Sequence, residues 1–112
     1  MPASLDALPS RLRERARHCR LGGVPALLIE QDDRPRPFLL WMHGRTADKE
    51  TDPGRYLRCI RSGFNVCALD LPGHGERFDA ELQTPEAAMT VITTMAEELD
   101  GVLMDLARSD SF

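Results

Sequence analysis

The chain has 112 residues, enough for one domain of modest size, and 42% of them are hydrophobic, which is too many for a disordered protein. A formal net charge of −4 and an isoelectric point near 5.3 argue against a nucleic-acid partner, because nucleic-acid-binding domains are normally basic. No apolar stretch reaches membrane-spanning length and no secretory signal is visible, so we expect no membrane partner.

The N-terminal segment is polar and rich in basic side chains. We expect residues 1–16 to form a solvated helix or arm, separate from the folded region over residues 17–112. The basic side chains come from five arginines: Arg11, Arg13, Arg15, Arg17 and Arg20.

A β-hairpin and a buried strand are predicted next. Residues 17–21 and 24–30 flank Gly22-Gly23, and two consecutive glycines are typical of the tight turn that joins antiparallel strands. After a charged loop, the segment Phe38–Met42 is apolar without interruption. Such a run is typical of a strand buried on both faces, as in a parallel sheet covered by helices.

A short helix and a second apolar strand follow. Asp52 is expected to cap this helix, with Pro53 as its first residue and Gly63 ending it in the left-handed conformation. Residues 65–69 then form another brief apolar run. Together with the strand Phe38–Met42 and the helix between them, this run predicts a βαβ unit with parallel strands.

The strongest helical pattern lies near the C-terminus. Thr84-Pro85-Glu86 combines a cap, a proline and an acidic first turn. Gly101 within the helix costs only about 1 kcal/mol relative to alanine and should not end it. The apolar residues recur at intervals of three and four, which predicts one buried stripe made of Ala88, Ile92, Met95, Leu99, Val102 or Leu103, and Leu106.

Both strands of the predicted βαβ unit end in a histidine-glycine turn. Residues 37–50 read PFLLWMHGRTADKE, and residues 68–77 read ALDLPGHGER. The carboxyl ends of neighbouring parallel strands meet at one edge of a sheet, where open α/β sheets bind their ligands. The two turns are therefore predicted to border one site.

This succession of elements resembles the amino-terminal half of an α/β-hydrolase, in particular the dienelactone-hydrolase-like and acyl-peptidase-like esterases. Two motifs carry the resemblance, His43-Gly44-Arg45-Thr46 and Asp70-Leu71-Pro72-Gly73-His74-Gly75-Glu76-Arg77. The resemblance implies an α/β fold, in which the hairpin, the βαβ unit and the long helix belong to a sheet that is a three-layer αβα sandwich when complete. It also implies a serine-dependent hydrolase of small carboxylic esters or related acyl compounds, without a cofactor.

The resemblance implies a specific role for the first motif. In these enzymes the loop after the third strand supplies one backbone N–H to the oxyanion hole, and the matching position here is Arg45. Gly44 would let the main chain approach the substrate oxygen; the alternative is that it merely permits a tight turn. The catalytic histidine of the family comes last in the chain, so neither His43 nor His74 matches it.

The other motif residues are expected to support the two loops. His43 is expected to hydrogen-bond the backbone near the oxyanion loop, and His74 to fix the turn formed by Gly73, His74 and Gly75. Asp70 is expected to accept hydrogen bonds from the backbone or from His74. Glu76 and Arg77 follow this turn; we expect them to form a solvated ion pair, the alternative being that they line the mouth of the cleft.

Two other functions fit the same residues less well. His43, His74 and Asp70 could together bind zinc or iron, but their spacing fits no compact metal-binding signature, so no metal is expected. A dinucleotide site also fails, because the turn Gly73-His74-Gly75 lacks the third glycine and the immediate helix of the Rossmann motif.

The chain contains no candidate nucleophile. None of its serines lies in Gly-x-Ser-x-Gly, and Cys67 is expected to be buried and inert. In the family, the nucleophile strand follows the final helix, which here means after Phe112. We therefore expect residues 17–112 to be the amino-terminal half of an α/β-hydrolase domain, truncated before the nucleophile strand, and this chain to be inactive alone. A fragment of a longer protein, a frameshifted relic and a short protein with another use all remain open.

The cysteine content indicates the redox state of the cellular compartment. They are three in number and form no Cys-x-x-Cys pair, which fits a protein of the reducing cytoplasm. Cys59 and Cys67 are expected to pack as small hydrophobic residues.

The leading alternative is a non-catalytic binding or assembly module. The strand Phe38–Met42 resembles a central strand, and without a partner on its free side it would expose an apolar edge. That edge could pair with a second copy of the chain or with a strand of a partner.

Overall fold

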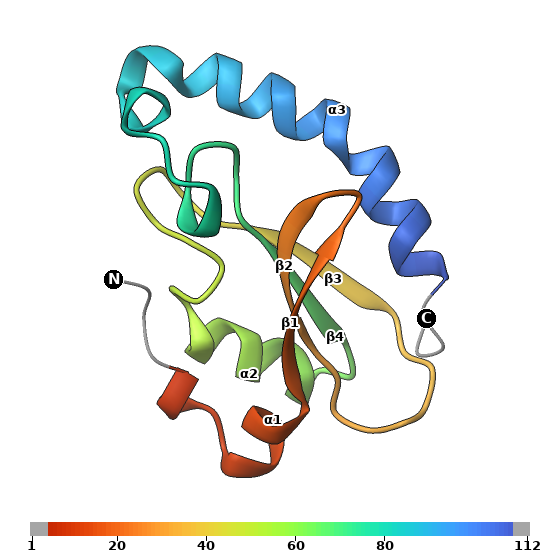
Figure 1. The fold of residues 1–112 in the computed structure, drawn as a ribbon. Coiled ribbons are helices and arrows are strands. Elements are labelled where there is room, and N and C mark those ends of the chain that lie inside the picture. Colours follow the sequence, from red (N-terminus) through yellow and green to blue (C-terminus); the bar gives the residue numbers. More distant parts are fainter. Residues whose placement is uncertain (1–4, 109–112) are drawn as a thin grey trace.

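The computed structural model describes residues 5–108, and their middle layer is a mixed four-stranded sheet in the order β1-β2-β4-β3 (Figure 1). β1 (Ala16–Leu21) and β2 (Val24–Ile29) form an antiparallel hairpin, and β2 also pairs antiparallel with β4 (Asn65–Leu69). β3 (Phe38–Met42) pairs parallel with β4. The predicted α/β class, hairpin and parallel βαβ pairing are therefore confirmed.

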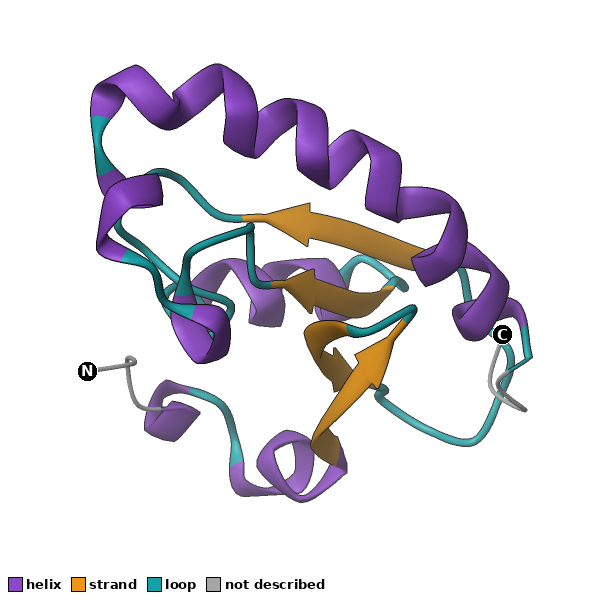
Figure 2. Cartoon of the chain, turned by 45° about the horizontal axis from the view of Figure 1, so that its top comes forward, coloured by secondary structure: helices purple, strands orange, loops and turns teal. Residues whose placement is uncertain are grey.

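Helices cover both faces of the sheet and create three layers (Figure 2). α3 (Ala88–Ala107) packs on one face, whereas α1 (Ser10–Arg15) and α2 (Pro53–Arg61) lie against the other. The buried side chains form one cluster on each face. On the α3 face they are Leu21, Val24, Ala26, Leu28, Cys67, Leu69, Met95, Val102 and Leu106. On the opposite face they are Leu8, Leu12, Leu27, Ile29, Tyr56, Ile60, Val66 and Ala68.

The hairpin turn is fixed by glycine and by its contact with α3. Gly22 and Gly23 have φ angles of 55° and 81°, which suit the turns that join twisted antiparallel strands. A side chain on Gly22 would come within 2.7 Å of the backbone of Gly101 in α3. The N–H of Gly22 also donates to the carboxylate of Asp105 at 2.5 Å. Gly101, which is unfavourable for the helix itself, thus lies where the hairpin meets α3.

α2 has both of its predicted ends. The carboxylate of Asp52 accepts a backbone N–H of the first turn at 3.1 Å, and Pro53 is the first helical residue. At the other end, Gly63 has a φ angle of 92°, and the N–H of Phe64 donates to the carbonyl of Cys59 at 3.1 Å. This backward bond across a left-handed glycine is the Schellman arrangement that ends many helices.

β3 is less buried than its sequence predicts. It lies at the end of the sheet order and pairs only with β4 among the described strands. Its first four residues are half-buried and Met42 is exposed, whereas all five residues of β4 are buried. The prediction of a strand buried on both faces is therefore wrong for β3, which has the composition of a central strand in an edge position.

α3 begins differently from its prediction. Pro85–Ala87 forms a separate 3-10 turn, and the hydroxyl of Thr84 donates to the carbonyl of Glu81 instead of capping the helix. The first buried residue is Val91, while Ile92 is 59% exposed, contrary to the predicted stripe. The later part of the stripe is confirmed by three buried residues, Met95, Val102 and Leu106. No helix among residues 5–108 is both long and apolar enough to cross a membrane.

The N-terminal segment contains a short helix, α1, but it contributes to the core instead of being fully solvated as expected. After a 3-10 turn at Leu5–Ala7, α1 ends at Arg15 and β1 follows at once. Leu8 and Leu12 are 2% and 1% exposed, because they pack on the face of the sheet that α2 also covers. Residues 1–4 of the predicted arm, and residues 109–112, lie outside the described residues.

Candidate functional site

The carboxyl ends of β3 and β4 lie side by side. Met42, the last residue of β3, is opposite Leu69, the last residue of β4. The histidines that follow approach each other, with the ring centroids of His43 and His74 5.1 Å apart and the ring planes inclined by 51°. The two histidine-glycine turns therefore form one surface at this edge of the sheet.

His43 links the two strand ends through backbone hydrogen bonds. Its Nε2 accepts the N–H of Leu71 at 3.1 Å, and its Nδ1 lies 2.7 Å from the carbonyl oxygen of Gly44. Because a carbonyl can only accept, Nδ1 carries the proton and Nε2 is the acceptor. Burial lowers the pKa of His43, since the imidazolium form would lose its hydration. His43 thus has the backbone bonding expected of it, and both ring nitrogens are engaged.

His74 is 1% exposed and has only one engaged nitrogen. Its Nδ1 donates to the carbonyl of Pro72 at 2.9 Å, which ties the ring to its own loop. Its Nε2 is buried and has no hydrogen-bond partner among residues 5–108. The hydrogen bond considered between Asp70 and His74 does not form within the described structure, because the Asp70 carboxylate is directed elsewhere.

Gly73 and Gly75 on either side of His74 both depend on the absence of a side chain. Their φ angles are 78° and 57°, in the left-handed region that favours glycine. A side chain at Gly73 would overlap Leu82, and one at Gly75 would overlap the carboxylate of Asp70. Conformation and packing together therefore account for both glycines.

The turn after β3 is built with fewer constraints. The N–H of Ala47 donates to the carbonyl of Gly44 at 3.1 Å, and the left-handed residue of this turn is Thr46, with a φ angle of 68°. Gly44 has no positive φ angle, and a side chain there would meet nothing within 4 Å in the described part of the chain. The tight turn therefore does not explain Gly44. Arg45 is exposed, and its guanidinium donates to the carbonyl of Gln83 at 3.1 Å.

A cavity of about 230 Å³ lies between the two turns and the beginning of α3. We call it the apolar cavity; its lining is His43, Gly44, Arg45, Leu71, His74, Leu82, Ala88, Val91 and Ile92. The structure thus brings four of the predicted site residues, His43, Gly44, Arg45 and His74, to one cavity. The other three, Asp70, Gly73 and Gly75, are not part of this lining.

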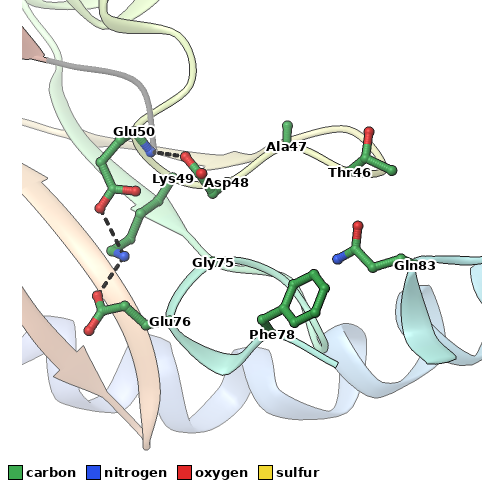
Figure 3. A pocket seen from close by; sticks show the side chains of 9 residues that line it. All are labelled: Thr46, Ala47, Asp48, Lys49, Glu50, Gly75, Glu76, Phe78 and Gln83. Atoms are coloured by element: carbon green, nitrogen blue, oxygen red, sulfur yellow. Dashed lines mark hydrogen bonds and ion pairs between the residues drawn. The ribbon is translucent and has the colours of Figure 1, made fainter. Parts of the chain in front are cut away.

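A buried group of charges beside the motifs was not predicted from the sequence. Lys49 is 1% exposed, and its ammonium nitrogen lies 2.9 Å from a carboxylate oxygen of Asp70 and 3.0 Å from one of Glu50. Glu76 approaches the same nitrogen at 2.5 Å, so that Lys49 lies between Glu50 and Glu76 (Figure 3). The fully buried carboxylate of Asp70 also accepts the backbone N–H groups of Lys49 and Glu76, at 3.0 Å each. We call these four residues the Lys49 cluster.

Lys49 remains charged within this cluster. Burial alone would lower the pKa of Lys49, but the hydrogen bonds to Glu76, Asp70 and Glu50 outweigh it and raise the pKa above its usual value. Tyr56 of α2 holds the backbone in place, because its hydroxyl donates to the carbonyl of Lys49 at 2.6 Å. One feature of the sequence could have singled out Lys49 for attention: it is the only lysine in a chain with thirteen arginines.

Arg77 and Glu76 do not form the expected ion pair with each other. The guanidinium of Arg77 contacts the carboxylate of Glu98 in α3 at 2.7 and 2.9 Å, and it donates to the carbonyl of Asp70 at 2.7 Å. Glu76 belongs instead to the Lys49 cluster. The two side chains therefore connect the turn after β4 to different neighbours.

A polar cavity of about 400 Å³ lies beside the Lys49 cluster (Figure 3). Its acidic side chains already have partners: Glu50 and Glu76 contact Lys49, and Asp48 accepts the N–H of Glu50 at 2.9 Å. Within residues 5–108, no three histidine, cysteine, aspartate or glutamate side chains are placed to hold a metal ion. Burial raises the pKa of Cys67 to about 12, which makes its thiol a poor nucleophile at neutral pH.

Comparison with known proteins gives a match of fold. No protein-family model matches the chain, and no curated protein matches it either. Among solved structures, the chain is similar to the crystal structure of TT1662 from Thermus thermophilus, with 28% sequence identity and a TM-score of 0.64. The match covers 84% of this chain and 42% of TT1662, so the chain spans about two fifths of the length of that protein. The likeness supports an α/β fold shared with TT1662.

Proposed function

We propose that this chain is the amino-terminal part of a serine-dependent α/β-hydrolase that acts on small carboxylic esters or related acyl compounds. In this proposal the main chain of Arg45 contributes one N–H to the oxyanion hole. The nucleophile, the acid and the catalytic histidine come from sequence that follows Phe112 in the complete enzyme. The 112-residue chain alone is catalytically inactive.

One observation carries the proposal: the turn after β3 borders the apolar cavity at an open edge of the sheet. Gly44 and Arg45 are exposed there, and nothing in the described part of the chain fills the space beside Gly44. A glycine without a conformational or packing reason suits a point where a ligand or another segment approaches the main chain. The match covers only 42% of TT1662, so a protein with a similar fold can carry further elements beyond those of this chain.

The proposed chemistry uses the backbone of Arg45 and not its side chain. An activated serine attacks the acyl carbon, and the carbonyl oxygen of the substrate becomes an oxyanion. Two backbone N–H groups, one from Arg45 and one from the residue after the serine, stabilise this charge. The Arg45 guanidinium is bound to the carbonyl of Gln83, and the apolar cavity beside it receives the apolar part of the substrate.

The nucleotides that follow the Phe112 codon provide the first test. Read in all three frames, they should encode Gly-x-Ser-x-Gly within about twenty residues. If every frame lacks this motif, the proposal fails and the second candidate function below takes its place.

Substitution of Arg45 in the complete enzyme provides the second test. Arg45→Pro removes the backbone N–H and should lower kcat for a p-nitrophenyl ester by about 100- to 1000-fold. Arg45→Ala is the matched control, because it keeps the N–H and removes only the contact with Gln83; its kcat should stay within about threefold. Thermal denaturation checks that both variants fold. Equal losses of kcat in the two folded variants contradict the backbone role.

The exposed edge of β3 favours a second candidate function, a non-catalytic binding or assembly module. β3 pairs only with β4 among the described strands, so its other edge is open to a strand from another chain. Size-exclusion chromatography of the 112-residue chain distinguishes the two functions. A discrete, soluble dimer favours the module, whereas aggregation favours part of a larger enzyme.

A further inference from the structure

His43 is bonded to the same peptide group that carries the N–H of Arg45. Its Nδ1 donates to the carbonyl oxygen of Gly44 at 2.7 Å. That carbonyl and the N–H of Arg45 belong to one peptide group, which is trans, since the described chain contains no cis peptide bond. In a planar trans peptide the C=O and the N–H point in opposite directions. The N–H of Arg45 is therefore directed away from Nδ1 of His43.

The ring of His43 is itself fixed by a second hydrogen bond. The side chain is 5% exposed, and its Nε2 accepts the N–H of Leu71, beyond the end of β4, at 3.1 Å. A rotated ring or the other tautomer would break at least one of the two bonds. Through His43, the end of β4 thus determines the orientation of the peptide group between Gly44 and Arg45.

The two ends of this peptide group are treated differently. The carbonyl of Gly44 accepts a second hydrogen bond from the N–H of Ala47 at 3.1 Å, in addition to that from His43. Hydrogen bonds of this kind polarise the peptide group, and its N–H becomes a stronger donor as a result. Within residues 5–108, no acceptor is bonded to the N–H of Arg45. The peptide group therefore offers an oriented and polarised N–H to a further acceptor.

We propose that His43 is a positioning residue for the oxyanion hole: its hydrogen bond to the carbonyl of Gly44 orients and strengthens the N–H of Arg45. This inference rests on the proposed function, in which that N–H stabilises the oxyanion. The charge on the substrate oxygen grows as the acyl carbon is attacked, so a preoriented and polarised donor stabilises the transition state more than the bound substrate. His43 exchanges no proton in this role.

Three substitutions separate this role from a purely structural one. His43→Asn keeps an N–H that can donate to the carbonyl of Gly44, but its side chain is too short to reach the N–H of Leu71. His43→Gln does the reverse, because its amide oxygen lies near the position of Nε2 and the bond to Gly44 is lost. His43→Leu loses both bonds at similar volume.

The experiment measures kcat and KM of the complete enzyme with a p-nitrophenyl ester. His43→Gln and His43→Leu should lower kcat by about tenfold or more and change KM by less than about threefold, because the N–H of Arg45 acts mainly in the transition state. His43→Asn should keep kcat within about threefold of the wild type. Equal values of kcat in the Asn and Gln variants, or losses of kcat that follow their melting temperatures, would overturn the proposal.

A spectroscopic measurement on the 112-residue chain does not depend on catalysis. Loss of the bond to Gly44 should move the carbonyl carbon resonance of Gly44 and the amide nitrogen resonance of Arg45 together in His43→Gln, and much less in His43→Asn. In the wild-type chain, the nitrogen-15 resonances of His43 should show the proton on Nδ1. A proton on Nε2 would overturn the proposal even if none of the variants folds.

The inference and the proposed function fail in different ways. If Arg45→Pro loses activity as expected but His43→Gln does not, the inference alone is wrong. If Arg45→Pro and Arg45→Ala lose kcat equally, the function is wrong, and the positioning role falls with it even where the resonances show the bond between His43 and Gly44.

Discussion

The ends of β3 and β4 lie side by side and carry similar histidine-glycine sequences, but they are constructed in opposite ways. At the end of β4, Gly73 and Gly75 have no room for a side chain, and the carboxylate of Asp70 is fully buried and paired with Lys49. At the end of β3, Gly44 and Arg45 are exposed, and a side chain on Gly44 would touch nothing within 4 Å among the described residues.

This difference separates residues that build the scaffold from residues that are available for a ligand. The glycines after β4 are explained by their own conformation and packing, so no functional role is needed to account for them. Gly44 and the main chain of Arg45 have no such explanation within residues 5–108, which makes the end of β3 the better candidate for substrate contact. His74 is the exception at the closely packed end, because its Nε2 has no hydrogen-bond partner in the part of the chain that the structure describes.

The largest effect is expected at the closely packed end. Lys49→Met would leave the carboxylate of Asp70 buried without its cation and should lower the free energy of unfolding by about 3–5 kcal/mol. Urea denaturation measures this change. Arg61→Met is the control, since Arg61 is exposed and its loss should change stability by less than about 0.5 kcal/mol. If the two variants lost a similar free energy of unfolding, the buried ion pair of Lys49 and Asp70 would not stabilise the fold.

A pair of glycine substitutions compares the two ends directly. Gly75→Ala introduces a left-handed alanine and displaces the carboxylate of Asp70, so it should cost about 2–4 kcal/mol. Gly44→Ala should change stability by less than about 0.5 kcal/mol, because neither conformation nor packing opposes it. Both values come from the same urea denaturation experiment. If Gly44→Ala were as costly as Gly75→Ala, the end of β3 would be as constrained as the end of β4.

The smallest effect is a pH dependence that arises from His43. Burial lowers its pKa, so the unfolded chain binds the proton more readily than the folded chain. The stability that this group contributes is present above the unfolded pKa of about 6.5 and is lost as the pH falls through the folded pKa.

The wild-type chain should therefore lose stability between about pH 7.5 and about pH 5.5 more steeply than His43→Gln, by at most about 1.4 kcal/mol per pH unit. Urea denaturation at the two pH values tests this. Identical slopes would mean that His43 takes up its proton equally well in the folded and unfolded chains.

The sequence correctly predicted helix ends and turns that are set by residues close together in the chain. Asp52 and Gly63 delimit α2 as expected, and Gly22-Gly23 forms the hairpin turn. The prediction failed at the start of α3, where Val91 and not Ile92 is buried. A helical period fixes the spacing of a stripe, but the layer that the helix packs on decides which residues face it.

By itself, the sequence determined the strands, the turns and the meeting of the two motifs at one edge of the sheet, because backbone preferences and the pairing of parallel strands follow from short segments. Only the tertiary structure decided that Lys49 is buried against Asp70, which lies 21 residues away in the chain, and that the side chains of β3 are only partly buried. It alone left Nε2 of His74 buried without a hydrogen-bond partner among residues 5–108. Such features depend on contacts between distant residues, for which the surrounding sequence carries no local signal.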